Sequence, residues 1–136
     1  MKNLMTMALP VMAFLFATNA AAANLDSSRP LICTAVDAVD CSAFDQCQRV
    51  TPQMVNLPRF IRIDLQNKEL SGDGRRTPIE HVTHVEHQVI MQGVRGGRAW
   101  SMSLSTRTGD LTGTVTDDGF GFVVFGVCTS LESLGS

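Results

Sequence analysis

Apolar and polar residues alternate along the last third of the chain with the period of two that is typical of half-buried β-strands. In residues 98–105, every second side chain from Arg98 to Leu104 shares one face, and the other face carries alanine and serines. Residues 111–116 repeat this alternation, and the Asp-Asp-Gly sequence after them is typical of a hairpin turn. Residues 122–125 (Phe-Val-Val-Phe) are apolar on both faces, which predicts a strand that is packed on both sides.

Shorter segments with strand character precede this region and are separated by turn-forming residues. Residues 31–39 fit a strand or a short helix, and their β-branched side chains favour the strand. Residues 52–59 hold two prolines and predict an irregular connection, whereas the polar, glycine-bearing residues 71–76 predict a mobile loop. The remaining predicted strands are residues 60–65, 69–71, 77–85 and 88–93. The sequence therefore predicts an all-β fold, an antiparallel meander of about 6–8 strands forming a small barrel or a half-open sandwich.

The first residues have the composition of a signal peptide. Lys2 precedes an apolar run over residues 4–17 that is too short to span a bilayer comfortably, and Ala22 or Ala23 offers a cleavage site. The product is expected to be periplasmic or secreted, without a stable membrane anchor after cleavage; a retained anchor is the alternative. The expected divisions of the chain are a signal peptide (1–23), a flexible leader (24–29), a β-domain (30–129) and a flexible tail (130–136).

The charge balance of the chain is weakly acidic. With Lys2 removed, the 11 basic residues become 10 against 13 acidic ones, a net charge near −3. A protein of this charge offers no general electrostatic attraction to nucleic acid or to an anionic membrane surface. The expected partner is therefore an envelope protein or a small ligand.

Four cysteines lie beyond the predicted cleavage site. An even number in an exported chain predicts two disulfides, with three possible connectivities. We favour Cys41–Cys47, which brackets a short polar loop, and Cys33–Cys128, which ties the first strand to the last. A zinc site is the competing interpretation, but the spacing contains no C-x-x-C pair.

Several short sequence segments, in a fixed order and spacing, resemble a group of small exported proteobacterial proteins. The segments are C-T-A (33–35), N-L-P-R-F (56–60), I-D-L (63–65), Q-G-V-x-x-G-R-A-W-S (92–101), T-G-x-L-T (108–112) and G-F-V-V-F-G-x-C-T (121–129). They cover nearly all of the chain beyond the signal peptide. The resemblance implies an exported, cysteine-containing β-domain and carries over no catalytic residue.

His81, His84 and His87 form an H-x-x-H-x-x-H sequence. On a strand, His81 and His84 point to opposite faces, and His87 is expected in a hairpin turn. We therefore interpret them as exposed histidines beside a turn, with a metal site as the weaker alternative.

No arrangement typical of catalysis or nucleotide binding is present in the sequence. There is no G-x-S-x-G nucleophile elbow and no glycine-rich phosphate loop between a strand and a helix, and the cysteines are expected to be oxidised. Asp117 and Asp118 are adjacent carboxylates, but the following Gly119 identifies them as turn formers. We predict a protein that is not an enzyme and needs no cofactor.

Trp100 is the only tryptophan and a candidate for ligand binding. An inward-facing Trp100 can line a pocket together with Met102, Leu104, Phe122 and Phe125, as in the mouths of many barrels. Small barrels have little room inside, so we expect these side chains to fill the interior rather than to line a pocket.

Two arginine-bearing segments are the other candidates. Arg75 and Arg76 end the loop at 71–76, and Arg95 and Arg98 flank a Gly-Gly turn. Arginine suits the bidentate recognition of a carboxylate. The leading hypothesis is an exported binding module for a protein partner, such as an inhibitor that inserts one of these loops. The alternatives are a lipocalin-like carrier of a small apolar ligand and a metal-binding protein or enzyme that uses the histidines.

Overall fold

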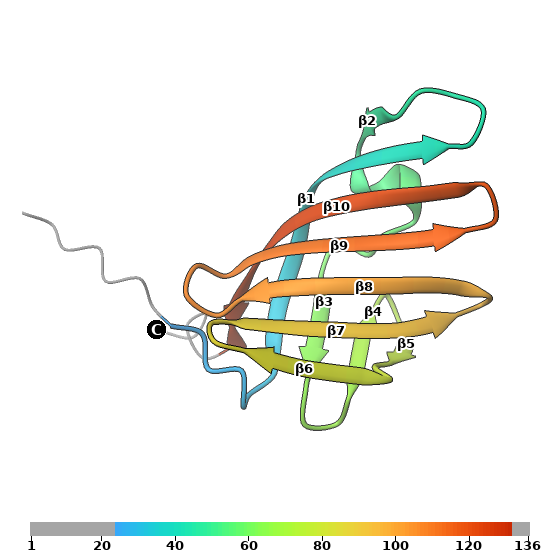
Figure 1. Cartoon of the computed structure of the whole chain (residues 1–136). Coiled ribbons are helices and arrows are strands. Elements are labelled where there is room, and N and C mark those ends of the chain that lie inside the picture. The colour runs from blue at the N-terminus through green and yellow to red at the C-terminus, as the bar shows by residue number, and fades with distance from the viewer. Residues whose placement is uncertain (1–23, 132–136) are drawn as a thin grey trace, which may run out of the picture.

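Ten antiparallel strands form one curled, half-barrel sheet in the computed structural model, which describes residues 24–131 (Figure 1). The predicted signal peptide and residues 132–136 of the predicted tail lie outside the described residues. The elements are β1 (Leu31–Ser42), β2 (Gln48–Val50), the 3₁₀-helix η1 (Pro52–Val55), β3 (Ile61–Asp64), β4 (Glu69–Gly72), β5 (Arg75–Pro78), β6 (His81–Val85), β7 (Gln88–Arg95), β8 (Arg98–Ser105), β9 (Asp110–Asp117) and β10 (Phe120–Ser130). The all-β prediction is confirmed, with more strands than expected.

The first and last strands pair at the centre of the sheet. The order is β5-β4-β3-β1-β10-β9-β8-β7-β6, and β2 adds to β1 alone. β1 and β10 are paired from Leu31↔Ser130 to Ser42↔Phe120. The sheet therefore consists of two meanders, β1-β3-β4-β5 and β6-β7-β8-β9-β10. The pairing of β1 with β10, which joins them, brings together the two ends of the domain.

The curl of the sheet produces two facing walls. In Figure 1, β6–β9 run side by side as one wall, and β3 and β4 cross behind them in a different direction. The edge strands β5 and β6 are consecutive in sequence and are linked by Ile79 and Glu80. These two residues donate backbone hydrogen bonds to both walls, Ile79 to Lys68 O (2.8 Å) and Glu80 to Gln92 O (2.9 Å). The connection therefore ties the free edges together.

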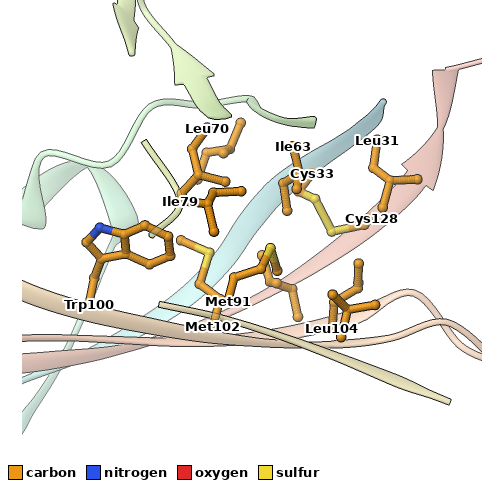
Figure 2. Close-up of a cluster of buried hydrophobic side chains, with 13 residues drawn as sticks. Leu31, Cys33, Ile63, Leu70, Ile79, Met91, Trp100, Met102, Leu104 and Cys128 are labelled. Atoms are coloured by element: carbon orange, nitrogen blue, oxygen red, sulfur yellow. A yellow bond between two sulfur atoms is a disulfide. The ribbon is translucent and has the colours of Figure 1, made fainter. Parts of the chain in front are cut away.

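The alternating pattern has its expected meaning in most strands. Trp100, Met102 and Leu104 on β8 are all at most 8 % exposed, and Ile61 and Ile63 on β3 at most 7 %. Figure 2 shows side chains from the two walls, such as Leu70 and Met91, meeting in one core cluster. The hydrophobic effect of burying these side chains drives the curl, because a flat sheet would leave one apolar face in water.

Both predicted disulfides are present. Cys33 and Cys128 are directly opposite each other on β1 and β10, within the core, and Cys41 and Cys47 close the β1–β2 hairpin. All four cysteines are paired. Disulfides of this kind are typical of proteins that fold in an oxidising compartment outside the cytoplasm.

Strand β10 differs from the prediction because only one of its faces is packed. Phe122 and Val124 are buried, whereas Phe125 is 43 % exposed and Val127 is 45 % exposed on the outer face. A single curled layer covers its concave side only, so the alternate apolar residues of β10 remain in contact with solvent.

Two segments have strand boundaries that differ from the prediction. Residues 71–76, predicted as a mobile loop, form the ends of β4 and β5 with a two-residue turn at Asp73 and Gly74. Residues 77–85, predicted as one strand, are broken at Ile79 and Glu80, where the chain passes from one wall to the other. Residues 31–39 are strand throughout, and residues 52–55 within the predicted irregular connection form η1.

The predicted leader and tail touch the sheet where they are described. Leu25 donates its backbone N–H to Thr106 O (2.7 Å) and packs against the core, and β10 continues to Ser130. Within residues 24–131, no helix has the length and apolar character needed to cross a membrane.

Candidate ligand-binding pocket

A pocket of about 390 Å³ lies between the two walls of the half-barrel. One side is formed by η1, β3, β4 and β5, and the other by β7, β8, β9 and β10. Pockets of this size hold small organic ligands in many proteins. The prediction that side chains fill the interior is therefore wrong at this end of the molecule, because the curled sheet does not close into a narrow barrel.

The inner part of the pocket is apolar. Its walls include Leu70 from β4, Trp100 and Met102 from β8, Val115 from β9 and Phe122 from β10. Each of these residues points inward because of the period-two alternation of its strand. Figure 2 shows Trp100 at one end of the core cluster, which also holds Leu70 from the facing wall and Ile79 from the connection between β5 and β6. The pocket is thus continuous with the hydrophobic core, and it is the part of the interior that the core side chains do not fill.

Trp100 occupies its position because the neighbouring strand presents a glycine. Gly93 is the partner of Trp100 in the β7–β8 pairing, and a Cβ added to Gly93 would lie 2.7 Å from Cζ2 of the indole. Only a residue without a side chain allows the ring to lie this close to β7. The Nε1 atom of Trp100 is buried and has no hydrogen-bond partner among the described residues.

The outer part of the pocket carries three arginines. Arg75 comes from β5, and Arg95 and Arg98 flank the two-residue turn between β7 and β8. Gly96 and Gly97 in that turn have positive φ angles of 55° and 80°, which a hairpin of this length requires. The turn therefore sets both arginines at the mouth of the pocket.

Arg98 is neutralised by a carboxylate that also lines the pocket. Its Nε lies 2.8 Å from Oδ2 of Asp117, and its guanidinium lies 5.7 Å from the ring centre of Phe120. The pKa of Asp117 is lowered, first because the backbone N–H of Asp118 donates to it and then because Arg98 does. Asp117 is therefore ionised at neutral pH, and this pair adds no net charge to the pocket.

Arg75 and Arg95 are held by uncharged partners. Arg75 donates to the backbone oxygen of Asn56 (3.2 Å), and Arg95 donates to Oγ1 of Thr77. Neither has a carboxylate within ion-pair distance among residues 24–131. Their charges face the pocket without compensation.

Four of the five predicted binding residues lie around this pocket: Arg75, Arg95, Arg98 and Trp100. Arg76 does not, because it follows Arg75 on β5 and so points to the outer face, 3.6 Å from Glu69. The predicted lining residue Phe125 also lies on the outer face, and Leu104 is fully buried in the core.

The histidines do not converge. His81 and His84 are exposed on opposite faces of β6, and His87 is exposed in the turn before β7, as the pattern predicted. Among the described residues, no three His, Cys, Asp or Glu side chains lie close enough to hold a metal ion.

Sequence reasoning missed the second wall of the pocket. Leu70 and Thr77 were not recognised as lining residues, and neither were residues 55–58, which include the end of η1 and the three residues after it. The alternation in residues 60–65 identified an inward face there, but no local pattern shows which strand lies opposite.

Comparison of the chain with protein-family models, with curated proteins and with solved structures found no significant match. The chemistry of the pocket is therefore the basis for assigning a function.

Proposed function

We propose that this protein is an exported, non-enzymatic binding module that takes a small ligand with an apolar body into the pocket beside Trp100. The observation that carries the proposal is the pocket itself, about 390 Å³ with an apolar interior and a polar mouth. This combination orients a ligand, because apolar contacts supply the affinity and a few polar groups fix its direction.

The proposed location is the periplasm or the extracellular space. The two disulfides support a compartment that keeps thiols oxidised, and the predicted signal peptide supplies the route. A small carrier in such a compartment moves or stores apolar molecules that dissolve poorly in water.

A small ligand in this pocket is favoured over a protein partner whose cleft receives a loop of this chain. An inhibitor that inserts an arginine-bearing loop needs a segment that protrudes from the fold. The two candidate segments are instead tight turns at Asp73-Gly74 and Gly96-Gly97, and the arginines Arg75, Arg95 and Arg98 line the pocket.

The fluorescence of Trp100 gives a direct test, because the chain contains one tryptophan and no tyrosine. Titration of the purified exported protein with apolar ligands of graded length should shift or quench the emission in a saturable way. Val115→Phe adds a ring to the pocket wall and should weaken binding about tenfold, since it displaces about two methylene groups of the ligand at about 0.8 kcal/mol each.

Thr114→Phe is the matched control. Thr114 precedes Val115 on β9 and is exposed on the outer face, so the same ring is added outside the pocket. This variant should bind like the unaltered protein. A signal that stays flat across the panel, or equal losses in the two variants, contradicts the proposed function.

A further inference from the structure

The pocket differs in charge from the rest of the molecule. Its lining holds three arginines and one aspartate, a net charge of +2, whereas the whole chain has a net charge of −2. Because Arg98 is paired with Asp117, the uncompensated charge belongs to Arg75 and Arg95. A pocket with a positive net charge in a protein that is negative as a whole favours a negatively charged ligand.

The two uncompensated arginines approach the mouth from opposite walls. Arg75 lies on β5 and Arg95 at the end of β7, and both line the same pocket. Each guanidinium has five N–H donors in a planar fork that matches the oxygens of a carboxylate or a phosphate. The bond from Arg75 to Asn56 O and that from Arg95 to Thr77 Oγ1 use only some of these donors and hold the side chains in place.

We propose that the ligand is an amphiphile with an anionic head group, a carboxylate or a phosphate, bound between Arg75 and Arg95 while its apolar tail lies against Trp100 and Met102. This inference rests on the proposed function and adds the chemical class of the ligand. The arrangement also sets the direction of binding, with the head at the mouth and the tail directed inward.

Adjacent residues on β5 provide a control within one strand. Arg75 faces the pocket, whereas Arg76 faces outward and lies beside Glu69. Arg75→Gln and Arg76→Gln therefore remove the same charge from the chain, but only the first removes it from the pocket. Glutamine removes the positive charge at either position and keeps an uncharged side-chain amide donor.

The test compares ligands that share a tail and differ in their heads. Binding of decanoate, decyl phosphate, decan-1-ol and decyltrimethylammonium is measured through Trp100 fluorescence and by equilibrium dialysis. We expect decanoate or decyl phosphate to bind about 10-fold to 100-fold more tightly than decan-1-ol, as charge-assisted hydrogen bonds require. Added salt should weaken binding of the anions and leave the alcohol unchanged.

In the variants, Arg75→Gln and Arg95→Gln should each weaken anion binding about tenfold without changing the affinity for decan-1-ol. Arg76→Gln should leave both unchanged. Equal affinity for the acid and the alcohol, tighter binding of the cationic amphiphile, or equal effects of Arg75→Gln and Arg76→Gln overturn this inference and leave the proposed function standing. If no member of the panel binds, the proposed function fails, and the inference that rests on it fails too.

Discussion

Removing the two disulfides one at a time should have very different effects on stability. Cys33–Cys128 closes a loop with a sequence separation of 95, whereas Cys41–Cys47 closes one with a separation of 6. In the chain-entropy model, the long bridge stabilises the fold by about 4.7 kcal/mol and the short one by about 2 kcal/mol. The double variant Cys33→Ala/Cys128→Ala should therefore lose more than twice the stability lost by Cys41→Ala/Cys47→Ala.

The position of the long bridge in the sheet increases this difference. Cys33 is 1 % exposed and pairs with β10 on one side and with Ile61 of β3 on the other, so it joins the two meanders at the centre. Alanine at Cys33 and Cys128 also removes two buried sulfur atoms from the core, which adds a cavity cost in the same direction. The short bridge is near the tip of a hairpin, where the chain is already exposed.

Urea unfolding followed by Trp100 fluorescence and thermal unfolding followed by circular dichroism are the measurements. With about 2.1 cal/mol/K of unfolding entropy per residue over roughly 110 residues, the two losses correspond to about 20 °C and about 10 °C in Tm. Free-thiol assays on the unaltered protein provide the control that both bridges are formed. Equal losses of stability in the two double variants, or a larger loss when Cys41–Cys47 is removed, would refute the reasoning that the bridge between β1 and β10 stabilises the fold more than the short bridge does.

Two further predictions follow from the site and from its electrostatics. Gly93→Ala places a methyl group 2.7 Å from Cζ2 of Trp100, so we expect a stability loss of about 1–3 kcal/mol and a shifted emission maximum; an unchanged spectrum and urea midpoint would contradict the close packing. The pKa of Asp64 is lowered from 3.8, chiefly because the backbone N–H and then the side-chain amide of Asn67 donate to it. Its contribution to stability is therefore fully present above the unfolded pKa and is lost as the pH falls through the lower folded pKa. Asp64→Asn should reduce stability at neutral pH and flatten its decline below about pH 4; urea midpoints with the same pH dependence as the unaltered protein would count against this.

Local patterns in the sequence were sufficient for most of the secondary structure. The alternation over residues 98–105 corresponds to β8, and the Asp-Asp-Gly sequence corresponds to the β9–β10 turn, where Gly119 has a φ of 70°. The even number of cysteines predicted two disulfides, and their positions favoured the connectivity that the structure shows among three possible ones. These features depend on neighbouring residues or on chain composition, which a sequence displays directly.

One ambiguity in the sequence has a local structural cause. Residues 31–39 fitted a strand or a helix because their alternation is irregular, and the register of β1 against β10 shifts between Ala35 and Asp37. The extra residue, Val36, forms a bulge that reverses which residues face inward, so Cys33 and Ala38 are both buried. A bulge is defined by the partner strand, and the sequence of one strand alone does not reveal it.

The order of residues was enough to predict short, half-buried strands, tight turns and two disulfides. The pairing of β1 with β10 at the centre, the curl of the sheet without closure, and the pocket beside Trp100 that Arg75 and Arg95 both line became visible only in the folded protein. This difference arises because the alternation of apolar and polar residues indicates which face of a strand is buried but does not indicate which other strand packs against that face. The partner depends on pairings between residues far apart in the chain, and the open space depends on how completely side chains from two walls fill the volume between them.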